Sequence, residues 1–197
     1  MRESLLTLLR DKETSVELFR QTANQLAYLL AAESAAFVDE EPNTVTTPVG
    51  QAEGSFVDQR VVLVPILRAG LALLPAFLHY FPSAPIGFIG IRREAGTAKP
   101  HLYYENIPDL QPTDLVFILD PMIATAGSAL LTIEHLIKKG ASEMILVSML
   151  GSQEGLEKIE SQYPDVTMIV SATDPELDSR KYIVPGLGDF GDRYFGN

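Results

Sequence analysis

One stretch of the sequence decides the fold: Val116-Phe117-Ile118-Leu119-Asp120-Pro121-Met122-Ile123-Ala124-Thr125-Ala126-Gly127-Ser128. Its apolar beginning predicts a buried strand, which Asp120 and Pro121 end, and a helix is expected from about Ser128. The first amides of such a helix have no partner within it, and its dipole favours negative charge. Thr125 and Ser128 add hydroxyl donors. The turn therefore predicts an anion site, with small residues that let a phosphate approach the backbone.

Apolar strands and helices alternate on both sides of this stretch. Further strands are predicted over residues 61–66, 86–91, 144–149 and 166–171, and further helices over residues 11–34, 70–80 and 152–163. The first helix is expected to open with a capping pair, Thr14 and Glu17. Most of these strands are apolar on both faces, which is typical of a parallel sheet with helices on each side. Ligands of such sheets bind beyond the carboxyl ends of the strands.

Charged side chains follow the predicted strands. Arg68 comes after a long apolar run, and it either pairs with a carboxylate or faces the crevice and binds an oxyanion. Arg92 and Arg93 end the next strand, and only one of them can face the crevice because strand side chains alternate. Asp120 is either a turn-former or an acceptor for sugar hydroxyls. We expect these strand ends to converge on one pocket.

The remaining segments are rich in glycine and proline. Residues 37–60 predict a loop or β-excursion with a short strand over 45–47. Residues 94–113 predict a long connection, which in a compact domain is more often functional than idle. The tail over 183–196 has no predicted helix after it, so it does not match a dinucleotide-binding fingerprint. Because it carries several aromatic residues, we expect an ordered lid whose backbone approaches a flat ligand.

The composition narrows the function further. The 197 residues are enough for one domain, and there is no cysteine for a disulfide or a thiolate site. A net charge of −11 argues against a nucleic-acid partner. If the ligand is a phosphate, a few local arginines and backbone amides must hold it, and a divalent ion would help. No membrane-spanning run or secretory signal is apparent, which makes the cytoplasm the expected location. His79, His101 and His135 lack the spacing of metal ligands.

Taken together, these pieces resemble uracil phosphoribosyltransferases along nearly the whole chain. Pro121 stands where other phosphoribosyltransferases usually carry a second acid, as it does in the uracil enzymes. The early pieces Leu9-Arg10-Asp11-Lys12 and Phe19-Arg20 also fit. The main matches are Val64-Pro65-Ile66-Leu67-Arg68-Ala69-Gly70-Leu71, the stretch from Asp120 to Ser128, and Tyr182-Ile183-Val184-Pro185-Gly186-Leu187-Gly188-Asp189-Phe190-Gly191-Asp192.

The resemblance implies an α/β fold of the type I phosphoribosyltransferase class. This is a Rossmann-like parallel sheet flanked by helices, with a protruding β-arm and a C-terminal hood, over residues 1–197 as a single domain. The implied reaction of pyrimidine salvage transfers ribose 5-phosphate from phosphoribosyl diphosphate (PRPP) to uracil, giving uridine monophosphate (UMP) and diphosphate. Mg²⁺ is implied as a cofactor held mainly by substrate oxygens rather than by protein ligands. A homodimer or higher homo-oligomer and a GTP effector are also implied.

The same resemblance assigns the site. It implies that Arg68 and Asp189 are catalytic, that Arg68 and Arg93 hold the diphosphate, and that Asp120 meets the ribose hydroxyls. The implied PRPP-binding set is Arg68, Arg93, Asp120, Pro121, Met122, Ile123, Ala124, Thr125, Ala126, Gly127, Ser128 and Asp189. The implied uracil-binding set, acting mainly through backbone groups, is Ile183, Gly188, Asp189 and Phe190.

Two details depart from the family. Ala126 stands where glycine is usual, which costs about 1 kcal/mol if the position needs a positive φ. The arm over 94–98, which in the family is associated with dimer formation, matches only loosely. Two alternatives therefore stay open beside the active enzyme. One is a catalytically weak paralogue that binds PRPP or nucleotides as a regulator, and the other is a phosphoribosyltransferase for another base, against which the tail argues.

Overall fold

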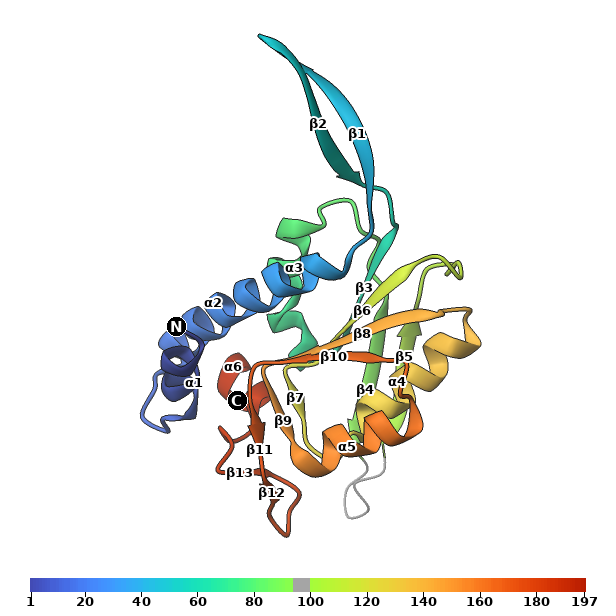
Figure 1. The fold of residues 1–197 in the computed structure, drawn as a ribbon. Helices are drawn as coiled ribbons and strands as arrows, with labels where there is room; N and C mark the ends of the chain where they lie inside the picture. Colours follow the sequence, from blue (N-terminus) through green and yellow to red (C-terminus); the bar gives the residue numbers. More distant parts are fainter. Residues whose placement is uncertain (94–99) are drawn as a thin grey trace.

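A six-stranded sheet forms the centre of the molecule (Figure 1). The structure is a computed structural model that describes residues 1–93 and 100–197, without the side chain of Arg93. The strand order is β10-β8-β6-β3-β4-β5, and all neighbours run parallel except β4 and β5. The strands are β3 (Val61–Leu67), β4 (Phe88–Arg93), β5 (Pro100–Asn106), β6 (Leu115–Leu119), β8 (Glu143–Ser148) and β10 (Thr167–Val170). The predicted, mostly parallel sheet is confirmed.

Helices cover both faces of this sheet (Figure 1). Along β6, Leu115, Phe117 and Leu119 join one apolar core, and Val116 and Ile118 join the other. The first core is closed by α1 (Arg2–Arg10), α2 (Val16–Ser34), η1 (Ala35–Phe37), η2 (Ala69–Ala72) and α3 (Leu74–Tyr80). The second is closed by α4 (Gly127–Lys138) and α5 (Gln153–Gln162). Burial on both sides explains why the strand is apolar at every position.

The first helical region begins differently from the prediction. The sequence predicts one helix from residue 11, whereas the structure has two, because α1 ends at Arg10 and α2 begins at Val16. The cap of α2 is Ser15, whose Oγ accepts from the amide of Leu18 at 3.3 Å. The predicted capping residue Thr14 instead donates its hydroxyl to the carbonyl of Leu8 at 2.7 Å, so the Thr14–Glu17 pair was wrong.

An exposed hairpin within residues 37–60 confirms the predicted β-excursion. β1 (Glu40–Thr47) pairs antiparallel with β2 (Gly50–Val57), and nearly all of its side chains are exposed. The hairpin extends away from the sheet (Figure 1). A protruding β-arm is therefore present, but at 40–57. The arm expected over 94–98 lies outside the described residues.

The predicted connection over 94–113 contains a strand that the sequence analysis missed. β5 (Pro100–Asn106) pairs with β4 at the edge of the sheet, and most of its side chains are exposed or half-buried. An edge strand of this kind has few buried positions, so it leaves little apolar signal in the sequence.

Two small sheets and a short helix complete the fold. β7 (Met122–Ile123), β9 (Leu150–Ser152) and β11 (Thr173–Asp174) make a small parallel sheet, and β12 (Glu176–Leu177) pairs with β13 (Ile183–Val184). The glycine-rich tail itself contains a short helix that the sequence analysis did not predict, α6 (Phe190–Phe195). Six residues are too few for a helical period to be visible. Within the described ranges, no helix has the length and apolar character needed to cross a bilayer.

Candidate active site

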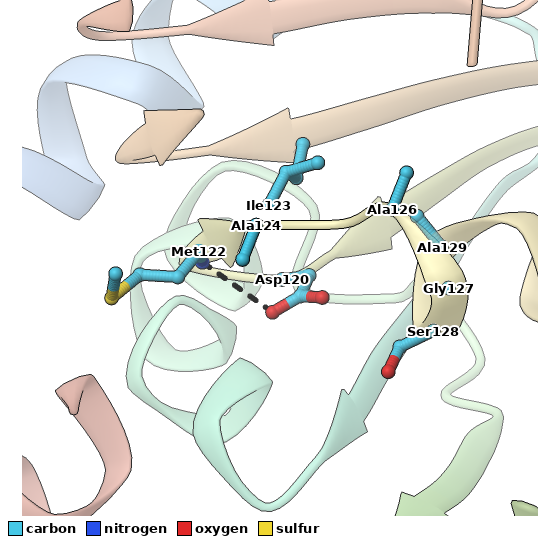
Figure 2. Close-up of a pocket in the computed structure, with 8 residues that line it drawn as sticks. All are labelled: Asp120, Met122, Ile123, Ala124, Ala126, Gly127, Ser128 and Ala129. Atoms are coloured by element: carbon cyan, nitrogen blue, oxygen red, sulfur yellow. Dashed lines mark hydrogen bonds between the residues drawn. The ribbon is translucent and has the colours of Figure 1, made fainter. Parts of the chain in front are cut away.

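The turn between β6 and α4 encloses a small pocket (Figure 2). Its lining residues are Asp120, Met122, Ile123, Ala124, Ala126, Gly127, Ser128 and Ala129. The helix begins at Gly127, one residue before the predicted position, and Ala126 caps it with a left-handed backbone at φ 61°. The predicted strand-turn-helix arrangement is confirmed, and the first amides of α4 lie at this pocket.

The acid at the end of β6 lies beside the start of the helix. In Figure 2 the Asp120 carboxylate lies between Met122 and the Ser128 hydroxyl, and Ile123 points to the opposite side. The Oδ1 atom of Asp120 accepts a hydrogen bond from the amide of Met122 at 3.4 Å. A carboxylate and a hydroxyl next to unpaired amides can bind a ligand that carries both hydroxyl groups and an anion.

Two residues of the predicted PRPP-binding stretch from Asp120 to Ser128 do not line this pocket. Pro121 is buried, and its carbonyl accepts from the amides of Met149 and Leu150 at 3.1 and 3.2 Å. Thr125 is half-buried and lies in the turn just before the helix. Pro121 therefore connects this stretch to the backbone at Met149 and Leu150.

The start of α5 supports the turn between β6 and α4. The Ser152 hydroxyl donates to the carbonyl of Ala124 at 2.5 Å and accepts from the amide of Gly155 at 2.9 Å. A Cβ at Gly155 would lie 2.3 Å from the carbonyl oxygen of Ala124. The backbone of Ala124 is thus held by a buried hydrogen bond and by a helix that approaches too closely for any side chain at Gly155.

The strand ends lie at one edge of the sheet, but Arg68 does not line the pocket, so their convergence on one pocket stays a prediction. β6, β3 and β4 are parallel neighbours, with Pro65 opposite Leu119 and Leu67 opposite Gly90, so Arg68 and Asp120 follow adjacent strands. Arg68 is exposed, and none of the ion pairs among the described residues involves it. The alternative in which Arg68 pairs with a carboxylate therefore has no support in that part of the chain. The side chain of Arg93 is not among the parts of the chain that the structure describes, so its expected role stays a prediction.

The tail reaches this edge of the sheet. The ring centroid of Phe195 lies 5.3 Å from the guanidinium carbon of Arg68, which joins the end of α6 to the end of β3. Asp189 is exposed and caps α6, its Oδ1 accepting from the amide of Asp192 at 2.9 Å. Gly188 has φ 82°, and Phe190 is buried against Phe19. The tail is thus an ordered element.

The predicted uracil residues do not lie in the pocket at α4. Ile183 is buried in β13, and it, Gly188, Asp189 and Phe190 are all absent from the pocket lining. The structure places these four residues in one continuous tail segment, which approaches the edge beside Arg68 through Phe195.

Sequence reasoning missed the side chains that hold the tail in place. Arg10 binds both carboxylate oxygens of Asp174, at 2.6 and 2.7 Å, and also the carbonyl of Gly186 at 2.9 Å. Arg193 donates to the carbonyls of Leu187 at 2.7 Å and of Leu9. A signal existed, because Leu9-Arg10-Asp11-Lys12 matched the family pattern, but no role could be read from it.

The ion pair between Arg10 and Asp174 makes the stability of the tail depend on pH. Hydrogen bonds from Arg10 hold the pKa of Asp174 below its ordinary value, and the same contact raises the pKa of Arg10. Because the folded pKa is depressed, the stabilisation is complete above the ordinary pKa of an aspartate and is lost as pH falls through the folded value.

We expect the melting temperature of Asp174→Asn to lie below that of the wild type at neutral pH. The difference should shrink below about pH 4, where the wild-type carboxylate also takes up a proton. Thermal unfolding followed by circular dichroism between neutral and acidic pH checks this. A difference that stays constant across the range would show that the charge of Asp174 contributes nothing.

Comparisons with known proteins agree with this geometry. The family model described as uracil phosphoribosyltransferase matches residues 1–197. Uracil phosphoribosyltransferases from Salinibacter ruber and Lacticaseibacillus paracasei are 40% and 42% identical to the chain, each over 97% of it and over 91% and 92% of their own lengths. The AQ2163 protein structure from Aquifex aeolicus matches with a TM-score of 0.91 and 34% identity, covering 98% of this chain and 93% of that one. A purine phosphoribosyltransferase from Pyrococcus horikoshii shares the fold, with a TM-score of 0.52 and 16% identity over 80% of this chain and 92% of its own. The predicted phosphoribosyltransferase fold is confirmed.

Proposed function

The chain belongs to the uracil phosphoribosyltransferase family, and from this premise we propose that it converts uracil and PRPP to UMP and diphosphate. It is a pentosyltransferase of pyrimidine salvage. The observation that carries the proposal is the pocket in which the Asp120 carboxylate lies next to the first amides of α4. That pairing suits a ribose with a terminal phosphate.

Each part of the phosphate turn has a role in this proposal. The backbone from Ala124 to Ser128 holds the 5-phosphate, with hydroxyl donors from Thr125 and Ser128. Asp120 accepts from the ribose hydroxyls. Pro121, Met122 and Ile123 belong to the predicted PRPP set as the segment that shapes the loop, and Ile123 is buried beneath it.

The reaction needs charge stabilisation more than a nucleophile. Positive charge develops on carbon 1 of the ribose as the diphosphate leaves, and a uracil nitrogen attacks from the opposite face. Arg68 and Arg93 at adjacent strand ends stabilise the negative charge of the leaving group. Arg68 is exposed, so its guanidinium is accessible to a bound diphosphate.

The carboxylates of the predicted site, Asp120 and Asp189, fit a magnesium ion that takes most of its ligands from the substrate. Asp120 lines the pocket and Asp189 is exposed, and oxygen donors of this kind suit Mg²⁺, which usually keeps several waters and binds substrate phosphates. Within residues 1–93 and 100–197, no three or more His, Asp or Glu side chains come together in an arrangement that could hold a metal ion. When bound, Mg²⁺ neutralises charge on the diphosphate oxygens.

Backbone groups of the tail read the base in this proposal. The amides and carbonyls of Ile183 and of Gly188 to Phe190 face the uracil edge, and Asp189 faces the ribose or the hydrated magnesium. Main-chain recognition discriminates well because cytosine presents an amino group where uracil presents a carbonyl, which leaves a buried group unpaired.

A homo-oligomer is proposed on the basis of the exposed hairpin. Val49 is 98% exposed, and Phe56 and Val57 are each 55% exposed on a β1–β2 arm that has no partner among the described residues. Apolar side chains in such an arm favour contact with a second copy of the chain. Activation by GTP stays a prediction, and assays with and without this nucleotide would test it.

The regulatory alternative rests on Ala126, and the backbone conformation at this residue shows how much alanine costs there. The φ of 61° costs alanine about 1–2 kcal/mol relative to glycine. Replacement by glycine would remove a buried methyl group, which lowers stability by about 0.8 kcal/mol. It would also make the unfolded chain more flexible, which lowers stability further, by about 0.4–1 kcal/mol. These terms nearly cancel, so alanine is tolerated and the active enzyme is favoured.

We therefore expect Ala126→Gly to change the free energy of unfolding by less than about 1 kcal/mol. Urea unfolding measures this, and Ala129→Gly inside α4 is the matched control because it should cost about 1 kcal/mol or more. If Ala126→Gly instead raised kcat/KM for PRPP about tenfold or more, a gain of about 1.4 kcal/mol, alanine would be impairing the turn and the regulatory alternative would be favoured.

The function itself is tested by mixing the protein with uracil, PRPP and Mg²⁺ and following UMP. We expect UMP to form, with hypoxanthine and cytosine inactive in the same assay. Absence of product while PRPP still binds would favour the regulatory alternative, and turnover of hypoxanthine but not uracil would favour an enzyme for another base.

A further inference from the structure

We propose that Arg10 and Asp174 are positioning residues for base recognition. Their ion pair holds the turn around Gly186 in the shape that presents the following backbone groups to uracil. The inference rests on the proposed function, since it concerns how that enzyme orients its base-reading segment. It assigns a role to the amino-terminal helix α1, which supplies Arg10 and lies outside the residues expected to touch either substrate.

Both backbone groups of Gly186 are held by this pair. Its amide donates to Asp174 Oδ2 at 2.9 Å, and its carbonyl accepts from Arg10 Nη1 at 2.9 Å. Arg10 also donates to both oxygens of Asp174, so the three residues form a closed set of hydrogen bonds. Gly186 therefore cannot rotate without breaking a charge-assisted bond.

The turn at Gly186 has no room to relax. Its φ is 59°, and a Cβ there would lie 2.0 Å from the carbonyl oxygen of Ile183. The loop thus folds back tightly onto a residue that belongs to the predicted uracil set. A change in the orientation of Gly186 would move Ile183 on one side and Gly188 on the other.

A second arginine fixes the next residue. Arg193 donates to the carbonyl of Leu187 at 2.7 Å and to that of Asp11 at 2.6 Å, and its guanidinium lies 4.4 Å from the ring centroid of Phe19. Gly186 is therefore held by Arg10 of α1, and Leu187 is held by Arg193 of α6, which is itself bound to the carbonyl of Asp11. The segment from Gly188 to Phe190 begins directly after these two fixed residues.

A variant that tests this role at Arg10 must keep the positive charge of the side chain. The Asp174 side chain is only 7% exposed, so removing Arg10 altogether would leave a buried carboxylate without its partner and endanger the fold. Arg10→Lys keeps the charge but cannot make the two-pronged contact to Asp174 together with the bond to Gly186. Asp174→Asn is the second variant, since it keeps the shape and removes the charge.

The chain offers a matched control at the other end of the sheet. Arg60 donates to Asp114 at 2.6 Å and to the carbonyl of Asp109 at 3.2 Å, and Asp114 accepts from the amide of Gln111 at 2.8 Å. Asp114 is 1% exposed, so the arrangement repeats that of Arg10, a buried aspartate and a backbone turn. It lies before β3 and β6, at their amino ends. Arg60→Lys therefore shows the effect of replacing arginine by lysine in such an arrangement, without affecting the segment from Gly186 to Phe190.

Steady-state kinetics of UMP formation with both substrates varied provides the test. For Arg10→Lys and Asp174→Asn we expect KM for uracil to rise about tenfold or more, with KM for PRPP changed less than about threefold. Arg60→Lys should leave both values near those of the wild type. Melting temperatures establish that each variant is folded. Equal increases in both KM values, or no increase for uracil in either variant, would overturn the inference.

Calorimetric titration of uracil separates this inference from the proposed function. A wild type that binds uracil but forms no UMP would overturn the proposed function alone. Equal uracil affinity in the wild type and Arg10→Lys would overturn the positioning role, whatever the turnover. Tenfold weaker uracil binding by the variant would support that role.

Discussion

Replacing Arg68 by alanine is expected to lower kcat for UMP formation about a hundredfold, with much less effect on uracil binding. Arg68 follows β3 at the edge where Asp120 follows β6, and it is exposed. In the proposed reaction Arg68 acts on the leaving diphosphate, whereas backbone groups of the tail bind the base. An interaction that strengthens in the transition state affects the rate rather than ground-state binding.

The control for this variant is Arg180→Ala. The guanidinium of Arg180 lies 5.4 Å from the Tyr182 ring, much as Arg68 lies 5.3 Å from that of Phe195, and both arginines are exposed. Removal of Arg180 deletes a cation–π contact of the same kind, at a position that does not follow β3, β4 or β6. If the two variants lost activity equally, or if Arg68→Ala kept wild-type turnover, Arg68 would have no role in stabilising the leaving group.

Gly155→Ala is expected to weaken PRPP binding about tenfold and to destabilise the fold by about 2 kcal/mol. The added methyl would lie 2.3 Å from the carbonyl oxygen of Ala124, so either α5 or the phosphate turn must move. The better helix propensity of alanine offers about 1 kcal/mol in return, which is too little to offset an overlap with backbone atoms. The hydrogen bond from Ser152 to Ala124 transmits the displacement to the pocket.

Gly50→Ala provides the comparison, because a Cβ at Gly50 meets no atom within 4 Å and lies in the exposed hairpin. Urea unfolding and the KM for PRPP should both stay near the wild-type values in this variant. A Gly155→Ala protein that matched Gly50→Ala in both measurements would show that α5 does not hold the phosphate turn.

Local pattern was sufficient to predict the phosphate turn. Val116 to Leu119 are apolar in succession because both faces of β6 are covered, and Asp120 and Pro121 mark the end of the strand. A positive φ at Ala126 was considered only as the condition under which alanine would be costly, and the structure has φ 61° there. These are properties of neighbours in the chain, and steric limits on φ and ψ act over single residues.

The exposed elements could not be predicted in the same way. β5 and the β1–β2 hairpin have most of their side chains in solvent, so no alternation of buried and exposed positions marks them. The short helix α6 was missed because six residues hold fewer than two turns. In each case the periodic apolar signal depends on a buried face that is small or absent.

The sequence by itself determined the parallel sheet, the turn between β6 and α4, and the resemblance to uracil phosphoribosyltransferases, because each follows from residues close together in the chain. Only the tertiary structure decided which distant charges meet. Arg10 and Asp174 are 164 positions apart, and Phe195 reaches Arg68 from the far end of the chain. Hydrophobic periodicity specifies which face of an element is buried but not which polar side chains meet when those faces come together. The packing of the two apolar cores makes that choice.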